Sequence, residues 1–310
     1  MATEAGTYIP TAAKITFEEL AKALLENWTV NGRRSMKSLR ASVANLRKCF
    51  GNDRALQVTH TRIEAYKADR LAQGAAKGTI NHELAMLRRM FSLAHKAGQI
   101  PNPPAIEMLP LNNARQGFVD PADFARLLEA LPEHLKGLVE FLYLTSWRAG
   151  EARTLEWGDV DLPGRAIRLR AEHSKNGKAR LIKLSGRLLE VVENALAVRS
   201  LGCPLLFHNK GHALVDCRRS WTTATTAAGL NGLLIHDLRR SGIRNMVRAG
   251  VPESVAMKIS GHKTRTTFER YNITNEADLG DAAERIDAYL EAKRQEPSKV
   301  AVLADRRKVA

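Results

Sequence analysis

Residues 98–117, GQIPNPPAIEMLPLNNARQG, constrain the fold of this chain more than any other segment. Their four prolines, two glycines and three asparagines cannot sustain a helix, because proline removes a backbone donor and glycine is conformationally free. The chain has 310 residues, enough for two domains that each bury a core. We therefore expect five parts: an N-terminal extension (1–13), a helical domain (14–100), a linker (101–117), a second domain (118–293) and a basic C-terminal tail (294–310).

The first domain is expected to be helical, because its apolar residues recur at steps of three and four. Residues 36–50 and 78–98 show this pattern most clearly. Their apolar stripes are Leu39, Val43, Leu46 and Phe50 in the first segment and Ile80, Leu84, Leu87, Phe91 and Ala94 in the second. We interpret each stripe as core, with basic side chains on the opposite face. Thr79 or Asn81 is expected to cap the second helix, and Gly98 to end it.

The second domain combines helices with one extended segment. It begins with a helix signal, in which Asp120 is the cap and Pro121 takes the first helical position. Residues 166–184 alternate apolar and polar on both sides of Asn176-Gly177, which is typical of a β-hairpin. Helical periodicity returns after residue 234, and Gly250 is expected to end that helix. The pattern predicts a mainly α fold with a small antiparallel β-sheet, of the α+β class.

The charge balance indicates a polyanionic partner. The chain carries 48 Lys and Arg against 33 Asp and Glu, a net charge of +15. Basic side chains that neutralise phosphates release condensed counterions from nucleic acid, which makes nucleic acid the favoured partner. An anionic membrane surface, or a basic protein without such a partner, are the alternatives. No stretch approaches the roughly eighteen consecutive apolar residues of a membrane span, so we expect none.

The cysteines and histidines do not predict a metal site. The three cysteines are far apart and never form C-x-x-C, which argues against a disulfide framework or a zinc site and for a reducing cytoplasm. His208 and His212 have the spacing of two ligands on a helix face, but the Asn-Lys-Gly between them predicts a surface hairpin. We also expect no secretory signal, and the sequence contains no G-x-x-x-x-G-K-[ST] loop. We expect no cofactor.

Four short segments of the second domain hold groups suited to acid–base chemistry. TSWRAGE places Arg148 and Glu151 three residues apart, where the carboxylate can orient the guanidinium. HDLRR places His236 and Arg239 three apart on one helical face. HSKNGK and SGHKTRTTFERY add a hairpin lysine and, nine residues apart, a histidine and a tyrosine: Lys175, His262 and Tyr271.

This inventory is what phosphodiester transesterification needs when no metal takes part. Two arginine forks can bind the non-bridging oxygens and balance the charge that builds in the transition state. A histidine can accept the phenolic proton, and a lysine can protonate the departing oxygen. A phenol with a pKa near 10 is a poor nucleophile alone, so surrounding cations have to stabilise the phenolate.

The four segments, in this order, resemble the tyrosine site-specific recombinases, or phage integrases. The likeness covers about residues 14–290 and resembles that family's helical core-binding (SAM-like) domain followed by its catalytic domain. H-x-x-R alone occurs by chance in many proteins, whereas four segments that end in Gly-His with a tyrosine nine residues later are specific. The resemblance implies a site-specific DNA recombinase that cleaves and rejoins strands through a 3′-phosphotyrosyl link. A DNA-binding protein without catalysis and a type IB topoisomerase-like enzyme are the alternatives.

The resemblance also implies roles for the cations. Arg148 and Arg239 match the two arginines that clamp the scissile phosphate. Lys175 matches the hairpin lysine that acts as general acid toward the 5′-oxygen. Lys178 is a rival for that role, and we favour Lys175 because it precedes the turn, as the family lysine does. Glu151 matches a supporting carboxylate.

The remaining positions follow in the same way. His236 matches the first family histidine, which deprotonates the nucleophile or supports the phosphate. His262 matches the position, histidine or tryptophan in the family, that bonds the phosphate, and Tyr271 matches the nucleophile. The expected partners are double-stranded DNA, three further copies in a homotetramer on DNA and, left open, bending or directionality factors. We expect residues 1–13 to be too few for the arm-binding domain that many phage integrases carry.

The chain departs from the family pattern at two places. Ser146-Trp147 stands where the family usually has Gly-Leu before the first arginine, and Asn272-Ile273 follows the tyrosine without the basic residue often seen there. Some of these charges can have a role outside the chemistry. Glu151 can be an ordinary ion-pair partner, and we interpret Arg240, Arg244 and Arg248 as phosphate contacts or a solvated face.

Overall fold

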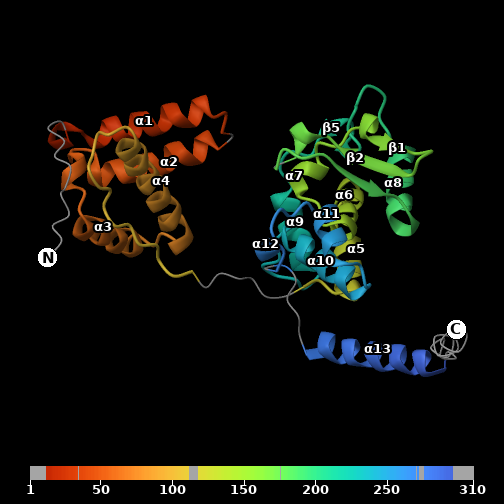
Figure 1. Ribbon diagram of the computed structural model, residues 1–310. Helices are drawn as coiled ribbons and strands as arrows, with labels where there is room; N and C mark the ends of the chain where they lie inside the picture. The colour runs from red at the N-terminus through yellow and green to blue at the C-terminus, as the bar shows by residue number, and fades with distance from the viewer. Residues whose placement is uncertain are drawn as a thin grey trace, which may run out of the picture. The chain divides into compact units, whose positions relative to one another are not determined.

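The structure is a computed structural model that describes residues 12–33, 35–111, 118–174, 176–269, 271 and 276–295. The chain falls into two compact units, residues 1–113 and 114–310, each with its own hydrophobic core. The described elements are mostly helices, with two small antiparallel sheets (Figure 1). The expected fold class is confirmed. None of the helices in the described ranges is long and apolar enough to cross a membrane.

The described residues of the first unit form four α-helices and two short 3₁₀ helices, Ala12–Lys14 and Ala55–Gln57. The α-helices pack together. They are α1 (Phe17–Val30), α2 (Met36–Phe50), α3 (His60–Ala72) and α4 (Lys77–Lys96). The predicted stripes of α2 and α4 are buried, and α4 packs against both α1 and α2. The predicted N-cap of α4 is wrong: the helix begins at Lys77 after extended Ala76, which places Thr79 and Asn81 inside it. Its predicted end is confirmed, because Gly98 follows the C-cap residue Ala97 with a φ of +68°, which suits glycine.

The proline-rich segment packs on the first unit over most of its described length. Residues 99–111 form neither helix nor strand, as its composition predicts. Ile100 and Ile106 are nevertheless buried in the core of this unit. The side chain of Asn81 accepts a hydrogen bond from the backbone N–H of Leu109 and donates one to its carbonyl, both at 2.8 Å. Asn81 therefore fixes the exit of the chain from this unit.

The second unit begins with helices that form its core. They are α5 (Pro121–Ala130), α6 (Glu133–Thr145), the short α7 (Ala149–Ala152) and α8 (Gly186–Ala197). As predicted, Asp120 is the N-cap residue of α5 and Pro121 opens the helix. The Asp120 carboxylate makes no capping hydrogen bond and instead pairs with Arg244, 3.3 Å away.

The second unit also contains two antiparallel sheets, the first between α7 and α8 in sequence and the second after α8. The first joins β1 (Val160–Asp161), β2 (Ala166–Leu169) and β3 (Arg180–Lys183) in that order, with Leu169 opposite Arg180. The predicted hairpin is confirmed, but its connection spans residues 170–179 and includes a 3₁₀ turn, rather than turning tightly at Asn176-Gly177. The second sheet pairs β4 (His208–Asn209) with β5 (His212–Ala213), which confirms the expected hairpin at the two histidines.

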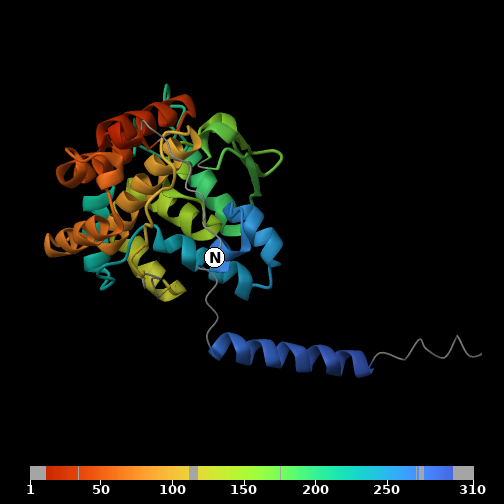
Figure 2. The same ribbon diagram turned by 60° about the vertical axis from the view of Figure 1, so that its left-hand side comes forward.

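The C-terminal helices are α9 (Arg218–Ala227), α10 (Asp237–Arg248), α11 (Glu253–Ser260), α12 (Arg265–Glu269) and α13 (Glu276–Gln295). Figure 2 shows α13 as one continuous helix. Helix α10 packs against α6 and α11, and Ile243, Ala256 and Phe268 bury one another at the centre of α10, α11 and α12. Every described side chain of α13 is exposed, including those of Leu279, Ile286 and Leu290.

Helices α6 and α10 meet at Gly242. A Cβ at this position would fall inside van der Waals contact with the carbonyl oxygen of Tyr143 and the hydroxyl of Ser146. Ser146 ends α6 in the left-handed region, with φ +57° and ψ +24°. Only a residue without a side chain at 242 allows this approach of the two helices.

Gly242→Ala is expected to lower the free energy of unfolding by about 3 kcal/mol, because the clash is with backbone that cannot rotate away. Urea denaturation followed by tryptophan fluorescence measures this, since Trp147, Trp157 and Trp221 all belong to the second unit. Gly150→Ala, also in a helix of this unit but with nothing within 4 Å of the new methyl, is the control. Equal stability of the two variants would contradict the expectation.

Candidate active site

Arg148 and Glu151 open helix α7 together. Arg148 is the N-cap residue, and its backbone N–H donates to Oε2 of Glu151 at 3.2 Å while its Nη1 donates to Oε1 at 2.9 Å. The Glu151 side chain is 3% exposed. Burial alone would raise the pKa of Glu151, but Arg180 and then Arg148 outweigh burial and hold that pKa below its ordinary value. The carboxylate is therefore ionised and fixes the Arg148 guanidinium.

Arg239 lies at the centre of the second unit, on the first turns of α10. Only 2% of the residue is exposed. Its guanidinium donates to the backbone carbonyl of Ser146 through Nη1, and Nη2 lies 2.9 Å from Nε2 of His262. Burial, followed by the charge of Arg148, lowers the pKa of Arg239 to about 9. The group remains charged at neutral pH and is held by main chain rather than by a carboxylate.

His262 is a buried, neutral histidine. Nδ1 lies 2.8 Å from the hydroxyl of Ser260, which donates to the carbonyl of Ala256. Ser260 therefore accepts the Nδ1 proton, which leaves Nε2 as the acceptor that faces Arg239. Burial, and then the charges of Arg239, Arg148, Arg180 and His236, lower the pKa of His262 to about 3.

The free energy of unfolding is expected to decrease as the pH falls, because of His262. The unfolded chain protonates this imidazole near its ordinary pKa of 6.5, whereas the folded chain does not until about 3. Its stabilising contribution is thus complete above pH 6.5 and is lost progressively below it, at up to about 1.4 kcal/mol per pH unit. Urea denaturation at pH 7, 6 and 5 should show a steeper decrease for the wild type than for His262→Gln. An equal decrease of the free energy of unfolding with pH in the two proteins would contradict a buried neutral imidazole.

Tyr271 follows α12 and lies among these groups. Its hydroxyl oxygen is 3.1 Å from Nε2 of His236, the N-cap residue of α10. The phenol ring centroid lies 4.9 Å from the ring of His262 and 5.8 Å from the guanidinium carbon of Arg239. The residue is half-buried. The tyrosine thus has an imidazole at its hydroxyl and a buried cation over its ring.

The two candidate lysines are on the β2–β3 connection. Lys175 lies outside the described residues, so its role stays a prediction, and Lys178 is exposed. The neighbouring Asn176 donates from Nδ2 to the carbonyl of Gly261 at 2.8 Å. The connection is therefore attached directly beside His262.

Seven site residues were predicted. The structure describes six of them, all in the second unit. Direct contacts join Arg148 to Glu151, His236 to Tyr271, and Arg239 to both His262 and Tyr271. A guanidinium pair, an imidazole at hydrogen-bond distance from a phenol and a buried neutral imidazole can bind a tetrahedral oxyanion and deprotonate a nucleophile beside it.

Sequence reasoning missed Arg180, which contacts this cluster. Its side chain is 8% exposed, binds Glu151 and lies 4.9 Å above the ring of Trp147. The sequence did contain one indication of this role: Arg180 shares a strand face with buried Ile182, and a charge on an inward face requires a buried partner.

The interpretation of the α10 arginines as a solvated face is also incomplete. Arg240 is buried, and Arg244 lies 4.3 Å from the ring of Phe118.

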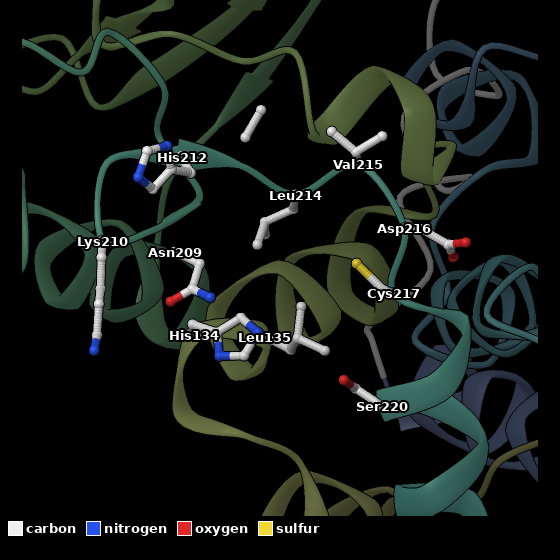
Figure 3. Close-up of a pocket in the computed structure, with 11 residues that line it drawn as sticks. His134, Leu135, Asn209, Lys210, His212, Leu214, Val215, Asp216, Cys217 and Ser220 are labelled. Carbon is white, nitrogen blue, oxygen red and sulfur yellow. The ribbon is translucent and has the colours of Figure 1, made fainter.

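A separate pocket of about 330 Å³ lies at the β4–β5 hairpin (Figure 3). Its lining includes His134, His212, Asp216 and Cys217, and none of the predicted site residues. In the close-up the imidazoles of His134 and His212 lie on the other side of the pocket from Asp216. Within the part of the chain that the structure describes, no group of three or more His, Cys, Asp or Glu side chains is placed to hold a metal ion.

Known proteins are similar to this chain in sequence and in fold. The integrase of Salmonella phage P22 is 24% identical over 230 residues, which cover 69% of this chain but only 58% of that protein. Tyrosine recombinase XerC of Rhodospirillum centenum is 28% identical over 67% of this chain and 66% of its own length. Among solved structures, a lambda integrase dimer bound to a core site matches with a TM-score of 0.69 at 17% identity, over 89% of this chain and 83% of that one.

Family models match both units. The model of the phage integrase N-terminal domain matches residues 18–111, and that of the phage integrase family matches residues 118–277. The second match alone covers more than half of the 310 residues and contains every candidate site residue from Arg148 to Tyr271. The chain belongs to the phage integrase family, the tyrosine site-specific recombinases.

Proposed function

We propose that the protein is a site-specific DNA recombinase that cleaves and rejoins strands through Tyr271. The observation that carries this proposal is Tyr271 itself: its hydroxyl oxygen lies 3.1 Å from Nε2 of His236, and its ring centroid lies 5.8 Å from the guanidinium carbon of buried Arg239. A phenol that serves only packing needs neither a base nor a buried cation next to it. Membership of the phage integrase family supports the same reaction class.

In the proposed reaction, Arg148 and Arg239 bind the non-bridging oxygens of the scissile phosphate. His236 accepts the phenolic proton while the Tyr271 oxygen attacks phosphorus. The bond from phosphorus to the 5′-oxygen breaks, and Lys175 donates a proton to that oxygen. A 3′-phosphotyrosyl link and a free 5′-hydroxyl result, so the bond energy is retained and a 5′-hydroxyl from another strand reverses the step.

The partner of the proposed enzyme is double-stranded DNA, and its working form is a homotetramer. The net charge of +15 suits binding to DNA. Exposed basic residues on α2 and α4 give the first unit a surface for phosphates: Lys37, Arg40, Lys48, Lys77 and Arg88.

The proposed tetramer has a precedent in the same fold. A lambda integrase structure is a tetramer on a Holliday junction, with a TM-score of 0.67. The exposed apolar side chains of α13 offer a contact between copies. Loss of residues 280–310 without loss of synapsis would count against that contact.

Covalent capture tests the proposal and requires no defined target sequence. The purified chain is mixed with a library of duplexes of random sequence, each nicked so that the short strand with the new 5′-hydroxyl diffuses away after cleavage. We expect SDS-resistant adducts, with peptide mapping to Tyr271 and the DNA attached through its 3′-phosphate. Sequencing of the captured strands then identifies a working duplex.

Two results would overturn the proposal. Binding to the library with no adduct at any sequence indicates a DNA-binding protein without strand cleavage. An adduct on a 5′-phosphate indicates a different polarity, and therefore a leaving group other than the 5′-oxygen.

A further inference from the structure

Arg180 binds the carboxylate of Glu151, which in turn binds Arg148. Its guanidinium pairs with Oε2 of Glu151, whereas Nη1 of Arg148 pairs with Oε1 of the same carboxylate. Both side chains of the Arg180–Glu151 pair are less than a tenth exposed. A carboxylate with one oxygen fixed by a buried guanidinium can offer the other in a single direction, and this direction sets the position of Arg148.

Arg180 is itself fixed from two further sides. Its Nη1 donates to the backbone carbonyl of Ser260 at 2.8 Å, at the end of α11. Its guanidinium carbon lies 4.9 Å from the centre of the Trp147 ring, the residue immediately before Arg148. A Cβ at Gly261 would collide with this guanidinium, so glycine at 261 leaves room for it. Strand β3, helix α7 and the end of α11 therefore meet at one side chain.

We infer that Arg180 is a positioning residue for strand cleavage, which acts through Glu151 to orient Arg148 at the scissile phosphate. The inference rests on the proposed function. Arg180 has no direct route to the DNA, because only 8% of its side chain is exposed and its fork is directed at Glu151 and Ser260. The position of a phosphate-binding guanidinium decides the rate more than the affinity, since it stabilises charge that develops in the transition state.

Arg180→Lys tests this with the fold preserved. A lysine ammonium can pair with Glu151 or bind the Ser260 carbonyl, but it cannot replace the planar fork that does both. Single-turnover cleavage of a duplex captured from the library should slow by about 10–100-fold, while the Kd for the same duplex changes by less than about twofold. Thermal melting checks the fold of each variant.

Arg187→Lys is the matched control. Arg187 on α8 pairs in a similar two-pronged way with Glu140, a carboxylate that is also mostly buried and is not one of the site residues. The Arg187→Lys variant should cleave DNA at the wild-type rate. Equal cleavage rates for Arg180→Lys and Arg187→Lys would overturn the inference.

A double-mutant cycle separates positioning from a general structural role. If Arg180 acts through Glu151, then Arg180→Lys added to Glu151→Gln should slow cleavage by less than about twofold further. Independent, multiplicative losses in the double variant would overturn the inference and leave Arg180 as an ordinary structural residue. Absence of any adduct from the wild-type protein would refute the proposed function instead, so the two failures are distinguishable.

Discussion

Tyr271→Phe is expected to abolish the covalent adduct and to leave DNA binding unchanged. The substitution removes the oxygen that lies 3.1 Å from His236 and retains the ring that packs against His262 and Arg239. The Kd for a captured duplex should stay within about twofold of the wild-type value, because an uncharged hydroxyl adds little to phosphate binding. Denaturing gels measure the adduct, and fluorescence anisotropy measures the Kd.

Tyr143→Phe is the control for loss of a hydroxyl in the same unit. Its hydroxyl donates to the carbonyl of Val119 at 3.2 Å, in the core and away from the site residues. The variant should form adducts at the wild-type rate, with a loss of about 1 kcal/mol of stability. An SDS-resistant adduct in Tyr271→Phe, mapped to any other residue, would refute Tyr271 as the nucleophile.

Arg239→Gln is expected to slow adduct formation by about 10³-fold, which is the loss seen when a preorganised donor to a developing oxyanion is removed. The loss of rate is expected to be large because the Arg239 guanidinium is buried. The Ser146 carbonyl and His262 hold this guanidinium in place before any DNA binds. A surface arginine in its place would have to be desolvated during the reaction. Single-turnover kinetics at saturating DNA measure the effect on the chemical step alone.

Two further variants define the origin of that loss. Arg239→Lys keeps the charge but not the fork, and it should recover less than about a tenth of the lost rate. Arg244→Gln removes a guanidinium from the same helix, one that lies over Phe118 and pairs with Asp120, and it should keep most of the rate. A rate for Arg239→Lys equal to that of the wild type would show that charge alone suffices.

Local periodicity predicted the helices well. The stripes of α2 and α4, the proline at the start of α5 and the glycine after α10 each follow from contacts within a few residues. The cap of α4 was wrong because Ala76 reaches an extended conformation without a side-chain hydrogen bond, so no residue type marks the boundary. The long β2–β3 connection was missed for a related reason: the Asn-Gly pair favours a tight turn, but the attachment of Asn176 to Gly261 involves residues 85 positions apart.

The candidate site was predicted as a set of residue types in order, not as a geometry. Sequence order indicated which residues to consider, whereas the distance between His236 and Tyr271 depends on how α10 and α12 pack through Ile243 and Phe268. The alternation of β3 places Arg180 on the face of Ile182 but does not identify its partners, which lie on α7 and α11. Long-range pairs of this kind are set by tertiary packing and leave only a weak trace in the local pattern.

The left-handed conformation of Ser146 has a consequence for how the site can change over generations. The turn at Ser146 presents its backbone carbonyl to Arg239, and every amino acid supplies the same carbonyl. Mutation at this position therefore alters the strain of the turn but not the anchor of the arginine. Glycine, usual in the family, and the serine of this chain can therefore serve equally here, whereas a larger side chain would meet α10, because Ser146 is fully buried beside Gly242.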